Sequence, residues 1–242
     1  MSIEPQRGSD PEFTFAFQPI VDTQAREVLS YEALIRGPGN EGAYQILSRL
    51  NGDTLPAFDQ RARVTAIGLA ARLGISCNLN LNFLPASLDP SGESILTTVS
   101  AAKQFNLPVN RIVLEVVEGE IIHETSHFTE VINKYRGLGL LVAIDDFGAG
   151  YSGLNLLADF QPDQVKLDMK LIRGIERHGP RQAIVRAINQ ICFELGIDVI
   201  AEGVETEMEY AWLASQGIHL YQGYLFAKPG FESLPSVHYP EV

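Results

Sequence analysis

The sequence lacks several features that would assign it to other classes of protein. Its 242 residues include only two cysteines, Cys77 and Cys192, which lie far apart, so neither a disulfide framework nor a CxxC metal motif is indicated. No run of about 18 apolar residues occurs, so no membrane span is expected. Basic residues are also scarce, 18 against 30 acidic ones, and the resulting net charge of −12 argues against a nucleic-acid groove.

The start of the chain lacks the apolar core of a signal peptide, which favours a cytoplasmic protein. Its first residues, MSIEPQRGSDPEF, are polar and show no periodic pattern. We therefore expect residues 1–13 to be a disordered tail or a remnant of cloning. Residues 14–242 have the length and hydrophobic content of one large globular domain.

Strand-like and helix-like segments alternate along this domain, and no internal repeat interrupts them. Apolar spacing predicts strands at 15–21, 28–35, 77–82, 112–117, 140–145, 164–168, 198–201 and 218–221. It predicts helices at 42–50, 59–73, 91–105, 127–138, 151–160, 180–195 and 207–215, with a loop after Pro229. This order predicts an α/β protein, a TIM-like (β/α)8 barrel. A doubly wound sheet is the alternative, although no glycine-rich dinucleotide loop follows the first strand.

The segment at 140–150, LLVAIDDFGAG, is the most informative part of the sequence. An apolar segment is followed directly by two adjacent carboxylates, Asp145 and Asp146, and then by a Gly-Ala-Gly turn. Two like charges at the end of a buried strand repel each other and lose hydration unless a cation or hydrogen-bond donors compensate. The segment therefore predicts a metal site.

Polar residues stand at the ends of nearly all the predicted strands, where barrel enzymes carry their reactive groups. Some have ordinary alternatives: Asn82 as a turn residue, Lys166 as a snorkelling surface side chain and Glu205 as a helix cap. Surface charge without a function would not follow strand ends so regularly. The predicted rim consists of Glu32, Asn80, Asn82, Glu115, Glu118, Asp145, Asp146, Lys166, Asp168, Glu202, Glu205 and Gln222.

The predicted ligands are carboxylate and amide oxygens, and the five histidines show no metal-ligand spacing. Such a hard ligand set favours magnesium or manganese over zinc or copper. Several carboxylates around one point suit two metal ions that activate water for phosphoryl transfer. Lys166 would orient the water or neutralise charge on the phosphate. Glu202 would ligate a metal or accept the proton of the water, and the sequence leaves both choices open.

These residues also form an ordered series of motifs. The chain has EALIR at 32–36, NFLP at 82–85, EVVE at 115–118, DDFGAG at 145–150, KLD at 166–168, AEGVE at 201–205 and QGY at 222–224. In these motifs the sequence strongly resembles the EAL family of cyclic di-GMP phosphodiesterases, over about residues 14–230. Gly153 and Leu84 each replace a serine that is common in the family, and neither change removes an expected ligand.

The resemblance implies a modified barrel in which the first strand is antiparallel to the others. It implies hydrolysis of one phosphodiester bond of cyclic di-GMP to give linear pGpG. The first metal ion would be held by Glu32, Asn82, Glu115 and Asp145. Asp145 would bridge to a second ion, held also by Asp146 and Glu202.

The resemblance assigns further roles around this site. Glu32, Lys166 and Glu202 are the expected catalytic residues, with Lys166 contacting the attacking water. Arg36 and Gln222 are expected to bind substrate, and Glu118 and Glu205 to support loops. The expected cofactors are two Mg²⁺ or Mn²⁺ ions, and Ca²⁺ is expected to inhibit, because its longer and looser coordination misplaces the water.

Partners and rival functions follow from the same resemblance. Family members often dimerise and are often fused to a sensor domain, so both are expected of the full-length protein. The main alternative is a catalytically silent receptor of cyclic di-GMP. Silent members lose a metal ligand or the lysine, and here none is missing, which favours an enzyme. An unrelated metal-dependent sugar-phosphate enzyme would share the acidic rim but does not explain the ordered motifs.

Overall fold

A closed ring of strands forms the centre of the molecule. The computed structural model describes residues 11–84, 93–121, 125–150 and 153–241. β2 to β8 run parallel in chain order, and β1 closes the ring by pairing with β2 and β8. The predicted barrel is confirmed, and the open doubly wound sheet is excluded. The strands are β1 Thr14–Asp22, β2 Glu27–Arg36, β3 Asn78–Asn82, β4 Ile112–Val117, β5 Leu141–Phe147, β6 Gln164–Leu167, β7 Asp198–Ala201, β8 Leu220–Tyr221 and β9 Gly230–Phe231.

β1 is the antiparallel strand that the family resemblance led us to expect. It pairs with β2 along its whole length, from Thr14 opposite Arg36 to Asp22 opposite Glu27. The short β8 pairs with its far end, and β9 pairs with Ala16 and Phe17. The prediction of a loop after Pro229 is therefore wrong at β9. A two-residue strand has no periodicity to detect, and it forms because β1 extends past the end of β8 and offers unpaired backbone groups.

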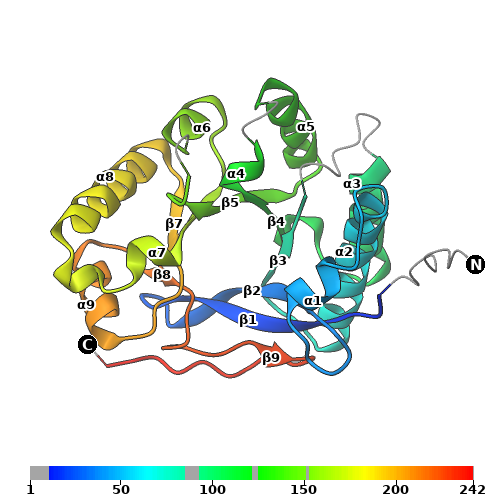
Figure 1. The fold of residues 1–242 in the computed structure, drawn as a ribbon, viewed down its shortest axis with the longest axis horizontal. Helices are drawn as coiled ribbons and strands as arrows, with labels where there is room; N and C mark the ends of the chain where they lie inside the picture. The colour runs from blue at the N-terminus through cyan, green and yellow to red at the C-terminus, as the bar shows by residue number, and fades with distance from the viewer. Residues whose placement is uncertain (1–10, 85–92, 122–124, 151–152, 242) are drawn as a thin grey trace, which may run out of the picture.

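The longer helices lie outside the ring, as Figure 1 shows. The predicted helix at 59–73 in fact begins at Leu55, because Pro56 occupies the first turn, where a missing N–H is tolerated. Two one-turn helices, α4 and α7, directly follow strands and were not predicted. The helices of the described residues are α1 Ala43–Leu47, α2 Leu55–Arg72, α3 Glu93–Gln104, α4 Glu118–Ile121, α5 Thr125–Gly137, α6 Gly153–Asp159, α7 Met169–Ile172, α8 Gly179–Leu195 and α9 Glu207–Ser215, with 3-10 turns η2 Val109–Arg111 and η3 Ile175–Arg177.

The hydrophobic core has two unequal parts. The larger part includes the outward-facing residues of the strands and the helix faces that cover them. The smaller part is a buried trio, Ile20, Ile200 and Leu220. Ile200 and Leu220 each precede a rim residue, Glu202 or Gln222, by two positions, so their side chains share the inner face of the ring with it. This apolar trio therefore fills the interior of the ring next to the end where Glu202 and Gln222 lie.

Some sequence expectations fall on residues outside the described part. These are residues 1–10 of the expected tail, Pro85 after the third strand, and Tyr151 and Ser152 after the central motif. The division into a tail and a domain from residue 14 stays a prediction. Among the helices that the structure describes, none combines the length and apolar character needed to cross a membrane.

Candidate active site

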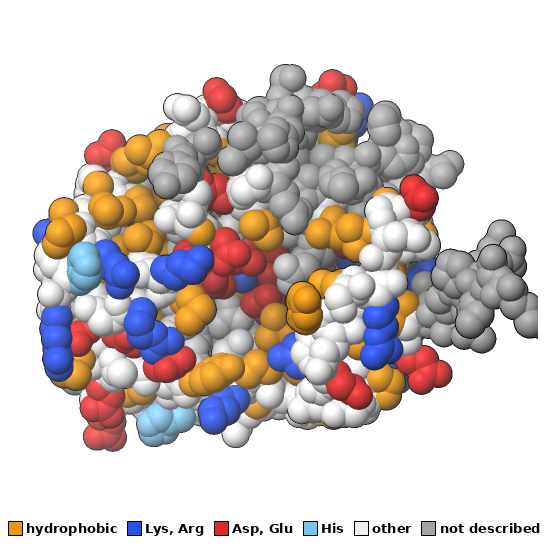
Figure 2. Space-filling model, in the orientation of Figure 1, with side chains coloured by type: hydrophobic (Ala, Val, Ile, Leu, Met, Phe, Trp, Pro, Cys, Tyr) orange, Lys and Arg blue, Asp and Glu red, His pale blue; other side chains and the backbone are white. Residues whose placement is uncertain are grey.

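The strand-end residues meet at one end of the ring, around a cavity of about 480 Å³. Figure 2 shows acidic side chains gathered near the middle of this face, with basic side chains elsewhere on it. Two expected residues lie at the side of the cavity: Asn82 donates to Glu32, and Glu115 pairs with Lys166. The expected residues that line the cavity itself are Glu32, Asp145, Asp146, Lys166, Asp168, Glu202, Glu205 and Gln222.

Glu32, Glu115 and Asp145 form a first group of carboxylates. They come from β2, β4 and β5, and one oxygen of each lies within 4.8 Å of the others. The amide of Asn82 adjoins this group, because its Nδ2 donates to Glu32 Oε1 at 3.3 Å. Behind it, Asn80 Nδ2 donates to Glu115 Oε1 at 2.9 Å and fixes that side chain. The structure thus brings together all four residues expected at the first metal.

Asp145, Asp146 and Glu202 form a second group, again with oxygens within 4.8 Å of one another. Neighbouring side chains of a regular strand point to opposite faces, so two successive aspartates would normally separate. Here the pairing of β5 with β6 shifts between Ile144 and Phe147, and Asp146 adopts a left-handed backbone with φ 54°. This irregularity keeps both carboxylates at the site, and Asp145 belongs to both groups.

Lys166 of β6 is the cation at the centre of these groups, and its side chain is only 1% exposed. Its Nζ lies 2.7 Å from both Glu115 Oε1 and Glu202 Oε1. It also lies 3.2 Å from Asp145 Oδ1 and 3.3 Å from Glu32 Oε2. The Lys166 side chain therefore lies buried among these carboxylates, and the alternative of a snorkelling surface lysine is excluded.

The pKa values of these groups indicate that the site carries less positive charge than its carboxylates require. Burial alone would lower the pKa of Lys166, but four carboxylates raise it well above its ordinary value. Burial raises the pKa of Glu202 to about 8 and that of Glu115 well above its usual range. The pKa of Glu32 is lowered, because Lys166 and donors from Gln222 and Asn82 outweigh its burial. One ammonium does not balance the carboxylates around it.

A divalent cation fits this donor set. The groups consist of carboxylate and amide oxygens, which are the ligands that Mg²⁺ and Mn²⁺ prefer. Glu115 Oε2 is buried and has no hydrogen-bond partner among the described residues, so it is available to a ligand. A cation here would also favour the ionised form of Asp146, whose pKa burial and the charge of Asp145 raise to about 6.

Glu118 and Glu205, the residues expected to support loops, lie just outside these groups. Glu118 is buried, and its Oε2 accepts the backbone N–H of Gly148 at 2.8 Å. It thereby holds the glycine turn after Asp146. Glu205 is exposed, and its Oε2 pairs with Arg173 Nη1 of the α7 end at 2.7 Å. It does not cap α9, because Thr206 fills that position.

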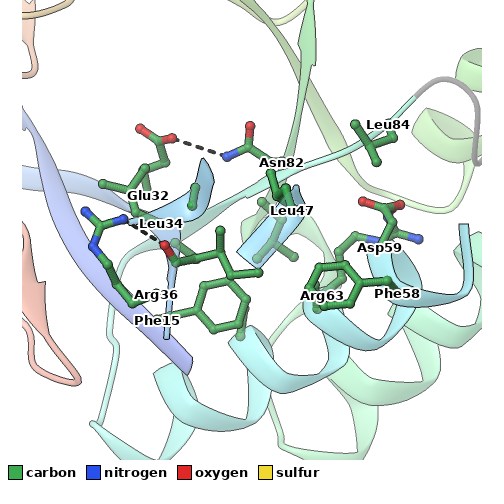
Figure 3. A pocket seen from close by; sticks show the side chains of 16 residues that line it. Phe15, Glu32, Leu34, Arg36, Leu47, Phe58, Asp59, Arg63, Asn82 and Leu84 are labelled. Carbon is green, nitrogen blue, oxygen red and sulfur yellow. Dashed lines mark hydrogen bonds and ion pairs between the residues drawn. The ribbon is translucent and has the colours of Figure 1, made fainter. Parts of the chain in front are cut away.

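Arg36 borders a second pocket, of about 300 Å³, which begins beside Glu32 and Asn82 (Figure 3). Its walls are mostly apolar, with Phe15 and Leu34 on one side and Phe58 on another. The guanidinium of Arg36 donates to the carbonyl of Ile35 at 2.8 Å. Polar groups line the remaining edge, where Asp59 and Arg63 form a buried ion pair. The pocket can take a flat apolar group whose edge carries donors and acceptors.

Two residues of the site were given no role from the sequence. Gln18 lines the cavity beside Gln222. It lies in β1, which is antiparallel to the other strands. The middle of β1 reaches the rim, so a search for polar residues at strand ends does not find Gln18. Asp168 was predicted at the rim and in the KLD motif but without a role. Its carboxylate caps α7 by accepting Lys170 N–H at 2.6 Å, and its charge also raises the pKa of Asp146.

Comparisons with known proteins show similarity over nearly the whole chain. A profile of the EAL domain matches residues 5–229. A crystal structure of a standalone versatile EAL protein from Vibrio cholerae O395 with c-di-GMP bound is 49% identical, covers 96% of this chain and 98% of that one, and has a TM-score of 0.92. A Klebsiella pneumoniae BlrP1 complex with manganese and cy-diGMP is 38% identical, covers 95% and 59% of the two chains, and has a TM-score of 0.88.

Curated relatives show the same similarity over part of their length. The blue light- and temperature-regulated antirepressor BluF of Escherichia coli K12 is 37% identical over 94% of this chain. The cyclic di-GMP phosphodiesterase PdeR of the same organism is 38% identical over 64% of this chain. The chain spans 57% of the length of BluF and 23% of that of PdeR, so these relatives contain regions that this chain does not match.

Proposed function

Because this chain belongs to the EAL domain family, we propose that it hydrolyses cyclic di-GMP by opening one phosphodiester bond to give linear pGpG. The observation that carries the proposal is the pair of carboxylate groups that share Asp145. Two adjacent cation sites with one common ligand suit the in-line displacement of a phosphate ester. The c-di-GMP bound in similar structures and the phosphodiesterase name of PdeR support the choice of substrate.

Two Mg²⁺ or Mn²⁺ ions are the proposed cofactors. Asp145 would be shared between them. When bound, the ions would supply an activated water and neutralise charge on the phosphate. The first ion would be held by Glu32, Asn82, Glu115 and Asp145, and the second by Asp145, Asp146 and Glu202.

Lys166 and Glu202 are the proposed groups that act on the water. The Lys166 ammonium lies between the two carboxylate groups and is fully charged, so it can donate a hydrogen bond to the attacking oxygen and hold it in place. Glu202 Oε1 is 2.7 Å from that ammonium. It would ligate the second ion or accept the proton of the water, and its place beside the ammonium and Asp145 suits either role.

Substrate binding is proposed to involve both pockets that meet at Glu32. Gln222 lines the carboxylate cavity and Arg36 borders the apolar pocket. Arg36 is suited to pair with a phosphate, because its guanidinium has donors beyond the one bonded to the Ile35 carbonyl. The apolar pocket is large enough for one guanine base beside the reacting phosphate.

The domain bounds, the oligomeric state and the link to a sensor domain are also proposals. We propose that residues 14–242 form the catalytic domain and that it acts as a homodimer. We further propose coupling to a sensor domain, since BluF and PdeR are both longer than the part that this chain matches. Light scattering of the purified protein would report its oligomeric state.

The test is to incubate the protein with cyclic di-GMP and Mg²⁺ or Mn²⁺ and identify the product by chromatography. Linear pGpG is the expected product. Glu32→Gln is the control, because it keeps the size of the side chain and removes a charged ligand; turnover should fall at least about 100-fold. Tight binding of cyclic di-GMP without any product would contradict hydrolysis and favour the silent receptor.

A further inference from the structure

The buried carboxylate of Glu209 joins two loops at the edge of the site. Glu209 lies in the first turn of α9 and is 2% exposed. Thr206 Oγ1 accepts the Glu209 N–H, while Glu209 Oε2 accepts the N–H of Thr206 at 3.1 Å, which makes a reciprocal capping box. The same oxygen accepts the N–H of Glu205 at 3.0 Å. These bonds organise the loop between β7 and α9.

The other oxygen of this carboxylate reaches a different segment. Glu209 Oε1 accepts the N–H of Gly174 at 2.9 Å, just after α7, and lies 3.9 Å from Arg173 Nη1. A capping box does not require such a contact. Although burial raises the pKa of Glu209, the three backbone N–H groups and Arg173 hold it below its ordinary value. The group is therefore a charged crosslink between the β7–α9 loop and the α7 segment.

Both segments carry groups of the cavity. The β7–α9 loop begins with Glu202 and Gly203, and α7 follows Asp168 and begins with Met169. The segments also touch at their inner ends, where a Cβ added to Gly203 would stand 2.6 Å from Met169 Cβ. They are thus held together by packing next to Glu202, by the exposed ion pair of Glu205 with Arg173, and by the buried carboxylate of Glu209.

We propose that Glu209 is a positioning residue that fixes Glu202 relative to α7 and so holds the second carboxylate group in shape for its metal ion. This inference rests on the proposed function. Glu209 touches neither Glu202 nor the cavity, so it acts only through the two segments. Hydrogen bonds behind a metal ligand commonly change metal affinity 10–100-fold when they are removed.

The test compares Glu209→Gln with Thr206→Ala. A glutamine can still complete the capping box, but it has a single acceptor oxygen and cannot serve both segments. Thr206→Ala removes the other half of the box and leaves the bonds to Gly174 and Glu205 in place, so it is the matched control for helix stability. Should Glu209→Gln fail to fold, Glu209→Asp replaces it in the test. Aspartate keeps the charge, but its shorter side chain cannot bond both segments at once.

Mn²⁺ binding is measured by electron paramagnetic resonance and hydrolysis by steady-state kinetics. The wild type should bind two Mn²⁺ ions. Glu209→Gln should bind one of them about tenfold more weakly and lose about tenfold in kcat, with KM changed less than threefold. Thr206→Ala should match the wild type in both, with a lower melting temperature.

Other results would overturn the inference. It fails if Glu209→Gln binds both ions as the wild type does, if Thr206→Ala weakens Mn²⁺ binding equally, or if the wild type binds fewer than two ions. A wild type that binds two ions and hydrolyses nothing would refute the proposed function alone, since the effect of Glu209→Gln on Mn²⁺ affinity still tests the positioning role.

Discussion

Lys166 is the residue on which the charge balance of the site depends. It is buried against four carboxylates, and only the attraction between them offsets the loss of hydration. Removing one partner from a buried ion pair leaves uncompensated charge, which costs about 3–5 kcal/mol. A bound cation would also neutralise these carboxylates, as Lys166 does. Stability and catalysis are therefore linked at this side chain.

We expect Lys166→Met to destabilise the metal-free protein by about 3–5 kcal/mol, because the carboxylates lose their counter-charge. Mn²⁺ should restore more stability to this variant than to the wild type. With Mn²⁺ bound, kcat should fall about 100-fold while substrate affinity changes less than threefold. Thermal melts, binding titrations and turnover measure these effects.

Lys134→Met is the control, because Lys134 is 62% exposed on α5 and pairs across the helix surface with Glu130. It should leave stability and turnover unchanged within about 0.5 kcal/mol and twofold. Equal losses of substrate affinity and rate in Lys166→Met would contradict a role in holding the water.

The raised pKa values of the carboxylates predict how metal binding depends on pH. In the metal-free protein the pKa of Glu202 is about 8 and that of Asp146 about 6. A cation binds the ionised forms, so it must displace protons below these pH values. Apparent Mn²⁺ affinity should therefore rise by about tenfold or more from pH 6 to pH 8 and level off above. Calorimetry in two buffers would show proton release; an affinity independent of pH would contradict these shifts.

At the level of elements, the site depends on how the strand ends and the short segments after them pack together. Glu118 holds the glycine turn after β5, and Gly203 lets the end of β7 pack directly on α7. Gly203 has a φ of +64°, which only glycine adopts readily. The turn after β7 is therefore limited by both conformation and space.

We expect Gly203→Ala to lose activity as well as stability, because its Cβ would clash with Met169 Cβ at 2.6 Å and push α7 from the cavity. Gly217→Ala is the matched control: its φ is +83°, and nothing lies within 4 Å of an added Cβ. Both substitutions should cost about 1 kcal/mol through the left-handed backbone. Only Gly203→Ala should lower kcat, by about tenfold or more. Equal kcat values in the two variants would show that the Met169 contact is irrelevant to catalysis.

At the level of the whole molecule, the closed ring brings carboxylates from β2, β4, β5 and the loop after β7 to one place. No single element holds a complete group of ligands, so ions that bind here tie distant parts of the chain together. Any divalent cation that fits should therefore raise the melting temperature of the entire domain. The identity of the cation should matter more for chemistry than for stability.

Calcium provides the corresponding prediction. Ca²⁺ accepts oxygen ligands at longer distances and in looser geometry than Mg²⁺ or Mn²⁺. It should raise the melting temperature and support binding of cyclic di-GMP, while turnover falls at least about 100-fold relative to Mn²⁺. Added to an Mn²⁺ reaction, it should inhibit. Full turnover in Ca²⁺ alone would contradict the proposed two-metal geometry.

The sequence alone determined the alternation of strands and helices, the barrel, and the polar residues at strand ends. These follow from local patterns: apolar periodicity, glycine turns, and carboxylates placed where no packing role explains them. Most of the strand ends were predicted within two residues, and the motifs pointed to residues that meet in space.

Only the tertiary structure decided which of these residues touch. The contact of Lys166 with four carboxylates, and the backbone turn that keeps Asp145 and Asp146 on one side, depend on strand register and on a local irregularity that periodicity does not encode. Gln18 joined the site because the middle of the antiparallel β1 pairs with Glu32 of β2. The crosslink of Glu209 to Gly174 spans 35 residues. Such contacts arise from closing the ring, and the energy of burying charge then determines which of them are stable.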